Sequence, residues 1–313
     1  MGGGGAAEVQ ALIEGDRKLL SSLATSVGVM AVTGEDEVFT RPRQSDFQRT
    51  LGVYPPIRQF VVGDVVRDWR LTDDPAILFP YSDRFVPQGY PAIRQLLWPY
   101  RTTVAAYICF GKTRAERGMM PTEYGMLVKQ SSDHRPSITF AFVATHNHFV
   151  LDRGEKVFNR TAPIIKLPAS ATVDDHLSLL GLLNSSAACF WMKQVFQNRG
   201  GQGINEGAKT EMWERFTEFA STQLHNFPIA SSPLEIARAL DAEAQRLSCN
   251  LPSSAATSDV PNRAKLDEAR AAADSARARM IALQEELDWR CYGQYGLIDN
   301  TPEYAEPPPH RLG

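Results

Sequence analysis

The stretch Ala162-Pro-Ile-Ile-Lys-Leu-Pro-Ala-Ser-Ala-Thr-Val-Asp-Asp-His-Leu-Ser-Leu-Leu-Gly-Leu-Leu-Asn-Ser-Ser-Ala-Ala-Cys-Phe-Trp191 contains the change of pattern that decides the fold. Its first part is a short apolar run closed by Pro168, which is typical of a last strand. Its second part begins at Thr172, three residues before Asp175, a spacing that can cap a helix. Apolar residues then recur at helical spacing up to Trp191, and the first half is apolar almost all round. We therefore expect this helix to be buried against a sheet.

Upstream of this stretch the sequence is rich in strand patterns. Short apolar or alternating runs are separated by Pro, Gly and Asp, as strands and turns require. These runs are Ile57–Val62, Ala76–Phe79, Val104–Phe110 and Ile138–Val143. Together with the run at residues 162–168, they predict a β-rich region over residues 57–167.

Downstream, a polar and Gly-rich segment, Asn198–Gly207, leads into a second helical pattern between Met212 and Leu224. Ser232-Pro-Leu-Glu235 then combines a capping box with proline at the first helical position, and this predicts a strong helix start. A linker is expected over residues 252–262.

A long helix is expected from Arg263 to about Trp289. Its apolar residues follow a seven-residue repeat, and they are Leu266, Ala269, Ala273, Ala276, Met280, Leu283 and Leu287. Such a repeat is the seam of paired helices, so it predicts an antiparallel helical hairpin or a coiled-coil arm.

The expected fold class is α+β, a mixed, β-rich domain with buried helices, followed by a C-terminal helical hairpin or coiled-coil arm. The expected organisation is a leader at residues 1–27 that can be flexible, a domain at 28–230, the arm at 231–300 and a disordered tail at 301–313. The three consecutive prolines of the tail favour disorder.

Composition excludes several classes of protein. Of 313 residues, 43% are hydrophobic and 22% are charged, which are ordinary globular values. The sequence contains no apolar run of about 18 residues and no secretory signal at its start, so a cytoplasmic location without a membrane partner is expected. The four cysteines are isolated, which predicts neither a zinc knuckle nor a disulfide framework.

The charge is unevenly distributed. Residues 41–160 hold 17 Lys and Arg against 11 Asp and Glu, although the whole chain has a net charge of −3. A basic middle is compatible with a polyanion partner, and a mixed solvated surface would give the same count.

The short motifs point to no complete catalytic site. Gly111-Lys-Thr113 lacks the glycine that a phosphate loop needs five residues earlier, where Ala106 stands. His146 and His148 could share one face of a strand as metal ligands, but no carboxylate or cysteine pair lies nearby at ligand spacing. Polar contacts at a strand end, including contacts to DNA, are the favoured reading.

Two further catalytic patterns are also missing. The sequence has no Gly-x-Ser-x-Gly elbow to position a serine nucleophile. Pro55-Pro56 is preceded by Tyr54 and followed by Ile57, so it does not match the Asn/Asp/Ser-Pro-Pro-aromatic tetrapeptide of amino-methyltransferases that act on DNA. Methyl-transfer chemistry is therefore not expected within this chain, although its status as an enzyme stays open.

The chain nevertheless resembles a family. The residues that carry the resemblance are Phe149–Pro168, Leu179–Trp191, Gly63–Trp69, Leu78–Tyr81 and Leu287–Leu297. They are similar, in the expected order over roughly residues 28–300, to the C-terminal target-recognition region of PglX-type adenine-specific DNA methyltransferases from BREX phage-exclusion systems. The domain at 28–230 is accordingly expected to be a target-recognition domain.

The resemblance also implies partners. Family members carry an N-terminal catalytic domain that binds S-adenosylmethionine, and this chain begins after the point where that domain would end. It therefore resembles a split-gene product, a truncated reading frame or a decayed fragment. The expected partners are double-stranded DNA and a methyltransferase catalytic domain or another defence-complex protein, with no cofactor in this chain.

Candidate DNA contacts follow from residue chemistry. Asn and Gln pair with adenine and Arg and Lys contact phosphates, although for each residue a surface charge or structural hydrogen bond is the competing reading. The candidate base readers are Asn147, Gln202 and Asn205. The candidate phosphate contacts are Arg67, Arg101, Lys112, Arg114, Arg160, Arg199 and Lys209. For Arg67 the specific competing interpretation is an internal ion pair with Asp68. For the Gly-rich segment it is an ordinary connection between two helices.

A second function class competes with DNA reading. The seven-residue seam of the arm could pair with a partner protein, which would make the chain an interaction scaffold and the sheet region a passive platform.

Overall fold

The computed structural model describes residues 4–51, 56–73, 75–129, 135–199, 216–231, 233–258, 260 and 262–302. Two four-stranded sheets form the centre. The first has the order β14-β12-β16-β2 and is antiparallel throughout. Its strands are β2 (Ser26–Gly28), β12 (Ser137–Phe140), β14 (Phe149–Asp152) and β16 (Ile164–Lys166). β12, β14 and β16 are buried along their whole length, as the apolar runs predict.

The second sheet has the order β15-β5-β8-β4, with β15 and β5 parallel and the other pairs antiparallel. Its strands are β4 (Thr40–Arg41), β5 (Ile57–Val61), β8 (Ala76–Leu78) and β15 (Lys156–Phe158). A three-stranded sheet, β13-β18-β17, adds β13 (Val143–Ala144), β17 (Gln197–Arg199) and β18 (Phe216–Glu218).

Short two-stranded pairs complete the β structure. They join β1 (Lys18–Leu19) to β19 (Pro228–Ile229), β3 (Ala31–Val32) to β11 (Met126–Leu127), β6 (Val66–Arg67) to β7 (Arg70–Leu71), and β9 (Ile108–Cys109) to β10 (Lys112–Thr113). With the helices described below, these sheets confirm the α+β class.

The helical stretch that follows β16 is divided into two helices. α6 (Val173–Leu183) starts at Thr172, which forms the predicted capping box with Asp175. The chain then turns at Asn184, and Ser185 caps a second helix, α7 (Ser186–Val195), by accepting a hydrogen bond from the Ala188 N–H. Most of α6 is buried, as its apolar pattern predicts, whereas the break at Asn184 is not visible in the helical spacing.

The cap of α6 gives a pH-dependent prediction. The Thr172 N–H and hydroxyl donate to the Asp175 carboxylate, and these bonds lower the pKa of Asp175. Since the folded pKa is depressed, the contribution is present above the ordinary Asp pKa and is lost as the pH falls through the folded value. We expect Thr172→Ala to cost about 1 kcal/mol of unfolding free energy at about pH 7, and less at about pH 3.

Urea unfolding at the two pH values measures this effect. Val173→Ala is the matched control, because Val173 is the exposed neighbouring residue and makes no cap. Equal losses in the two variants, or a loss from Thr172→Ala that does not change with pH, would contradict the capping argument.

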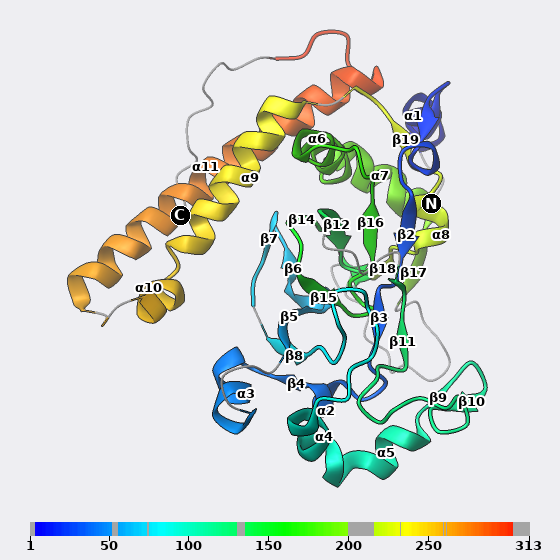
Figure 1. Ribbon diagram of the computed structural model, residues 1–313. Coiled ribbons are helices and arrows are strands. Elements are labelled where there is room, and N and C mark those ends of the chain that lie inside the picture. Colours follow the sequence, from blue (N-terminus) through cyan, green and yellow to red (C-terminus); the bar gives the residue numbers. More distant parts are fainter. Residues whose placement is uncertain are drawn as a thin grey trace, which may run out of the picture.

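The C-terminal arm is a helical hairpin. α9 (Leu234–Cys249) and α11 (Arg263–Tyr295) run side by side, joined through the short α10 (Pro252–Ser258) (Figure 1). The predicted seam is confirmed: six of its seven residues are buried and Leu266 is half-buried. α11 extends beyond Trp289 to Tyr295, and it ends at Gly296, whose φ of 71° suits glycine at a helix end.

Two details of the arm differ from the sequence prediction. α9 begins at Leu234, with Pro233 at the N-cap position instead of the first helical position, and no side chain caps it. Ser232 lies outside the described residues. The expected linker at residues 252–262 contains α10, because its Ala and Ser residues can extend a helix that packs between α9 and α11.

The arm is also attached to the body of the protein. The Trp69 indole N–H donates to the Gln284 side chain at 3.0 Å, and Arg153 forms an ion pair with the buried Asp241. In α6, a Cβ on Gly181 would lie 3.0 Å from the Ala237 Cβ, so the absence of a side chain allows α6 and α9 to approach closely. The seam is thus occupied within the chain, and it is not an open surface for a partner protein.

Three further predictions were wrong in the described residues. The leader is packed from Ala6 onward: α1 (Ala6–Glu14) and β1 are ordered, and Ile13 and Leu20 are fully buried. The run Val104–Phe110 is a strand only at Ile108–Cys109 (β9), since α5 (Arg101–Ala106) occupies its first half. Residues 216–218 form β18 and not a helix, followed by the short α8 (Ser221–Leu224), while Met212 lies outside the described residues. For β1 and β18 long-range strand pairing outweighs local spacing.

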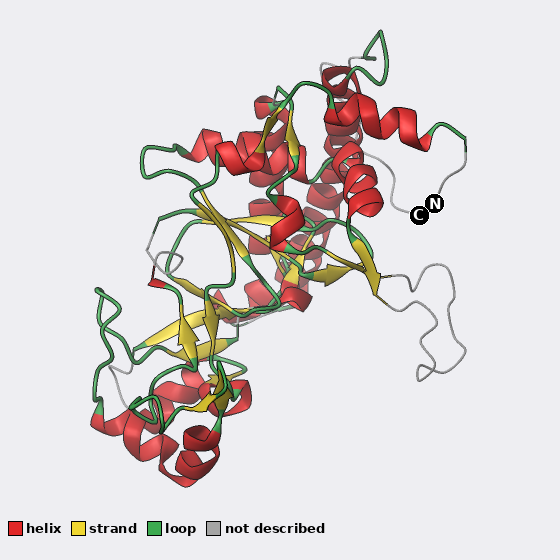
Figure 2. Cartoon of the chain, turned by 90° about the vertical axis from the view of Figure 1, so that its right-hand side faces the viewer, coloured by secondary structure: helices red, strands yellow, loops and turns green. Residues whose placement is uncertain are grey.

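The helices gather at two ends of the molecule. α1, α6 and α7 lie at one end, and the arm runs from there along the side of the sheets. α2 (Asp36–Phe39), α3 (Gln44–Leu51), α4 (Pro91–Leu97) and α5 lie with the β9–β10 hairpin at the other end (Figure 1). The sheets lie between them, which a view turned by 90° shows as well (Figure 2). The domain boundaries at residues 28, 230 and 300 stay predictions. The tail from residue 303 lies outside the described residues.

Candidate nucleic-acid interface

Two of the predicted phosphate contacts lie along one narrow strip of backbone. β18 pairs with β13 on one side and with β17 on the other. The strip continues beyond β13, because the Phe142 N–H donates to the Thr161 carbonyl at 2.9 Å. Arg160 stands at one edge of this strip and Arg199 at the other, and both are exposed. We call the strands β13, β17 and β18 with Arg160 and Thr161 the central ribbon.

The two arginines differ in how far their charge is compensated. Arg199 donates through Nε to the Glu218 carboxylate on the neighbouring strand, so part of its charge is neutralised within the ribbon. Arg160 is exposed and has no ion pair with a described residue at this edge. A phosphate would therefore compete with Glu218 for Arg199, while Arg160 offers its charge without that competition.

A third cation joins the central ribbon from α7. Lys193 is exposed in the last turn of that helix, and it is close enough to His146, just after β13, for its charge to lower the pKa of that imidazole. Burial is the larger cause of the lowered pKa. His146 is therefore neutral at neutral pH, and the positive charge of this area comes from lysine and arginine.

Arg67 lies beside the same edge. Its Nη1 donates to the carbonyls of Gly63 and Val66 at 2.7 and 2.6 Å, and the Gly63 N–H donates to the Thr161 hydroxyl at 3.0 Å. Arg67 is thus connected through Gly63 to Thr161, the residue that follows Arg160 in the sequence. The competing ion pair with Asp68 is not formed, because the Asp68 carboxylate instead lies 3.7 Å from His148 Nδ1.

His148 is the second histidine of this area. Burial lowers its pKa, Asp68 raises it, and Arg67 and His146 lower it further. The net effect lowers the pKa of His148, so its imidazole is neutral at neutral pH. Within the described residues, no group of three or more His, Cys, Asp or Glu is arranged to hold a metal ion, so the alternative of a metal site at His146 and His148 has no third ligand there.

Asn147, predicted as a base reader, has a structural position. Its Nδ2 donates to the Leu183 and Ser185 carbonyls at 2.7 and 3.1 Å, and both of its N–H groups are thereby used at the break between α6 and α7. Adenine recognition needs an amide that is free to donate and accept at a base edge. This geometry corrects the prediction and makes Asn147 a link between a loop and two helices.

The corrected role can be measured. Asn147→Ala should lower the unfolding free energy by about 1 kcal/mol, because two carbonyls lose their donor. The DNA sequence preference of the chain should not change. A site selection from random duplexes compares the variant with the unmodified chain, and relaxed preference with unchanged stability would restore Asn147 as a reader.

Arg114 is the second correction. Its side chain is 1% exposed, and its guanidinium donates to the carbonyls of Val104 and Thr33 in the interior. Burial lowers the pKa of Arg114, with partial compensation from Tyr81, Tyr107 and Glu35. A phosphate cannot reach it without unfolding this region, so Arg114 is a structural residue.

Arg101 and Lys112 form a separate group at the far end of the molecule. Arg101 begins α5 and is exposed, with its guanidinium carbon 4.5 Å from the centre of the Trp98 ring. Lys112 is exposed in β10. The structure thus divides the predicted phosphate contacts between the central ribbon and the α5–hairpin end, instead of gathering them at one point.

Three candidates cannot be placed. Gln202, Asn205 and Lys209 lie outside the described residues, as does most of the Gly-rich segment. The strands on either side are described: β17 and β18 pair as far as Arg199 and Phe216, so the segment between them starts and ends at the end of the central ribbon. The reading of this segment as a connection between two helices is wrong, since it joins two strands.

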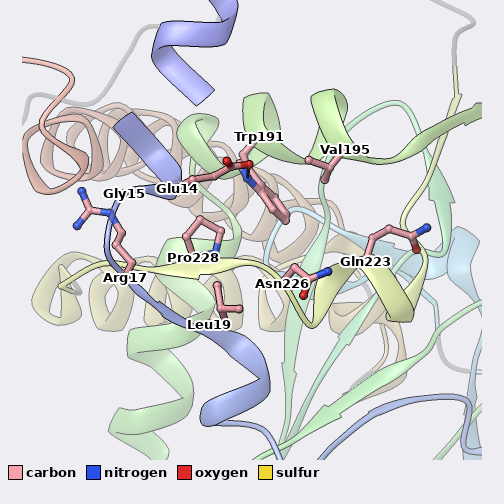
Figure 3. Close-up of a pocket in the computed structure, with 9 residues that line it drawn as sticks. All are labelled: Glu14, Gly15, Arg17, Leu19, Trp191, Val195, Gln223, Asn226 and Pro228. Atoms are coloured by element: carbon pink, nitrogen blue, oxygen red, sulfur yellow. Dashed lines mark hydrogen bonds between the residues drawn. The ribbon is translucent and has the colours of Figure 1, made fainter. Parts of the chain in front are cut away.

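A hollow of the described surface lies elsewhere. A cavity of about 410 Å³ is lined by α1, α7 and residues 223–228 (Figure 3). At its wall the Trp191 indole N–H donates to Glu14 at 3.0 Å, and beside it Arg17 donates to the Tyr295 carbonyl at 3.2 Å. These contacts attach the N-terminal helix to the body. None of the predicted DNA contacts lines this cavity.

Sequence reasoning missed Lys193 and the contact between His148 and Asp68. Lys193 follows Trp191 in the apolar helix, and only the break at Asn184 and the pairing of β13 bring it beside His146. No local signal in the sequence could have joined these residues. Among the described helices, none is long and apolar enough to cross a membrane.

No family model matches the sequence. The chain is 41% identical over 290 residues to the adenine-specific methyltransferase PglX of Streptomyces coelicolor, a match that covers 90% of this chain and 24% of that protein. The similarity to PglX predicted from the sequence is confirmed, and the chain spans about a quarter of that relative.

The structure of the Type IIL restriction-modification enzyme MmeI in complex with DNA is similar, with a TM-score of 0.52 and 17% identity. The matched region covers 90% of this chain and 34% of the MmeI chain. At this identity the likeness concerns the fold alone.

Proposed function

We propose that the chain reads DNA sequence for an adenine-specific DNA methyltransferase of a BREX-like phage-exclusion system, in the cytoplasm. The observation that carries the proposal is the 41% identity to part of PglX, a protein named as an adenine-specific methyltransferase. The DNA complex of MmeI, which shares this fold, adds support for DNA as the ligand. The exposed cations of the central ribbon give such a ligand a place to bind.

The mechanism divides the work between phosphates and bases. Arg160, Lys193 and, with internal competition, Arg199 would neutralise phosphates and fix the register of the duplex. The segment between β17 and β18 would then face the bases, and Gln202 and Asn205 remain its proposed readers. Lys209 remains a proposed phosphate contact of the same segment.

S-adenosylmethionine does not fit the described residues. Methyltransferases of this kind hold the cofactor at a Gly-rich turn between a parallel strand and a helix, where backbone N–H groups face the ligand. In the described part of the chain, the parallel strand pair β5–β15 leads into no such turn: β5 is followed by the 3-10 turn Gly63–Val65 and β15 by the bend at Arg160. The described residues therefore offer no place for a methyl-transfer step, and we propose that a catalytic domain supplies it.

The test is binding of the purified chain to random 30-base-pair duplexes, measured by fluorescence anisotropy between about 50 and 300 mM salt. The logarithm of the affinity should fall with the logarithm of salt by about 0.9 for each phosphate neutralised. Selection from the random pool should then enrich one short sequence. Affinity that does not depend on salt, or no binding at about 50 mM salt, would refute the proposal.

The scaffold alternative has lost its main support. It depended on an open seam in the arm, and α9 covers that seam within the chain. A catalytic domain or defence-complex partner stays a proposal, and it would have to use the charged outer faces of the arm or the body.

A further inference from the structure

The β9–β10 hairpin carries an aromatic residue at an unfavourable position. Its two-residue turn consists of Phe110 and Gly111, with φ values of 55° and 75°. Positive φ at both central residues is the mark of a type I′ turn, in which Asn-Gly is preferred. A large L-residue in this region is strained. Phe110 is also 78% exposed, so burial does not offset the strain.

A second hairpin of the same chain shows the usual compensation. In the β6–β7 hairpin, Asp68 and Trp69 also have positive φ values, 46° and 66°. Trp69, however, is only 5% exposed, and its indole N–H donates to Gln284. The strain at Trp69 is therefore balanced by packing. Phe110 has no such burial: the Arg117 guanidinium carbon lies 5.8 Å from its ring centre, and that guanidinium donates to the Gly125 carbonyl.

The surroundings of Phe110 are strongly basic. Apart from the buried Arg114, residues 91–120 hold four Arg and Lys against one acidic residue, Glu116. That carboxylate is engaged at the base of the hairpin, where it accepts hydrogen bonds from the Thr113 N–H and hydroxyl. Ile108, on the strand that leads to the turn, is 64% exposed. Lys112 is the first residue after the turn. An apolar tip flanked by cations complements a polyanion with an apolar interior.

We propose that Phe110 is a wedge that enters duplex DNA between neighbouring base pairs, with the exposed Lys112 on a flanking phosphate. This rests on the proposed function, because it takes DNA as the ligand. Apolar side chains that insert at a base step unstack it and kink the duplex, and the cost is repaid by wider contact with the protein. Pyrimidine–purine steps unstack most easily, so insertion should concentrate at TA and CA steps.

Permanganate oxidation of thymines, which is fast only where a base is unstacked, tests the wedge on the full chain. Bound duplexes that contain TA steps should show thymine reactivity several-fold above free DNA. Phe110→Asn is the decisive variant, because Asn-Gly is the preferred type I′ sequence and its melting temperature should be no lower than that of the unmodified chain. Its thymine reactivity should return to the level of free DNA, while its salt slope should not change.

Two controls isolate the role of the aromatic ring. Lys112→Gln should reduce the salt slope by about 0.9 and keep the unstacking. Val260→Ala, at an apolar residue that is 81% exposed on the arm side, should change neither quantity. If the unmodified chain does not bind DNA, the proposed function fails, and the wedge with it. If it binds but Phe110→Asn unstacks thymines equally well, the wedge alone is overturned, and the apolar tip becomes a surface for a protein partner.

Discussion

Replacing Arg160 and Lys193 together by glutamine is expected to weaken the binding of duplex DNA about 50- to 100-fold at about 0.1 M salt. Each exposed cation that neutralises one phosphate contributes a salt slope of about −0.9, which corresponds to roughly eightfold in affinity at this salt concentration. The double variant should therefore lower the magnitude of the slope by about 1.8. The loss should be similar for all sequences, because phosphate contacts carry no base information.

The choice of these two residues follows from their surroundings. Arg160 and Lys193 are both exposed, and neither makes an ion pair with a described residue. Arg199 stands at the other edge of the ribbon from Arg160, on β17, but its pair with Glu218 already uses part of its charge. Arg199→Gln alone is accordingly expected to have a smaller effect than Arg160→Gln, because Glu218 already neutralises part of the charge that Arg199 offers to a phosphate.

A matched control keeps the net charge equal. Arg263 and Arg270 are exposed on α11, so Arg263→Gln with Arg270→Gln removes the same two charges from the arm. If DNA uses the central ribbon, this control should lose less than about threefold in affinity. An equal loss in both double variants would mean that only the total charge of the chain matters, and the central ribbon would then not be an interface.

The periodic parts of the sequence predicted the fold well. The capping box at Thr172, the buried strands around Ile138 and Ile164, and the seam of α11 are all present, because each is a repeated pattern over many residues. Short runs failed. The pattern Val104–Phe110 satisfies a strand and a helix about equally, and its first half became α5 because it continues from the turn of Trp98–Tyr100.

The candidate site was less predictable, for a physical reason. The sequence shows that Arg114 and Lys112 have polar side chains, but not that one of them folds inward while the other points outward. That difference arises where residues after the β9–β10 hairpin return over α5, so that the Arg114 N–H donates to Tyr107 and the guanidinium reaches the Thr33 carbonyl, 81 positions away. Likewise, the Asn147 side chain donates to carbonyls at the break between α6 and α7, and the helical spacing of the sequence did not reveal this break.

Replacing Arg114 by methionine is expected to lower the unfolding free energy by about 2–4 kcal/mol. Methionine has a similar length and no charge, so the substitution removes the cost of burying a guanidinium. It also leaves the carbonyls of Thr33 and Val104 without their donor, and these backbone acceptors cannot be replaced in turn. An unpaired buried acceptor costs about 1–3 kcal/mol, and two of them outweigh the relief of the buried charge. Urea unfolding of the variant measures the difference.

Arg114→Met and Lys112→Gln together separate an effect on stability from an effect on DNA binding. Arg114→Met should leave the salt slope of DNA binding unchanged, because its charge never reaches the surface, whereas Lys112→Gln should reduce the slope by about 0.9 and leave the stability within about 0.5 kcal/mol. Arg114→Lys should not restore stability, since one ammonium cannot serve both carbonyls in the geometry of the planar guanidinium. A stable Arg114→Met variant with a reduced salt slope would mean that Arg114 is exposed in solution, and it would return this arginine to the set of phosphate contacts.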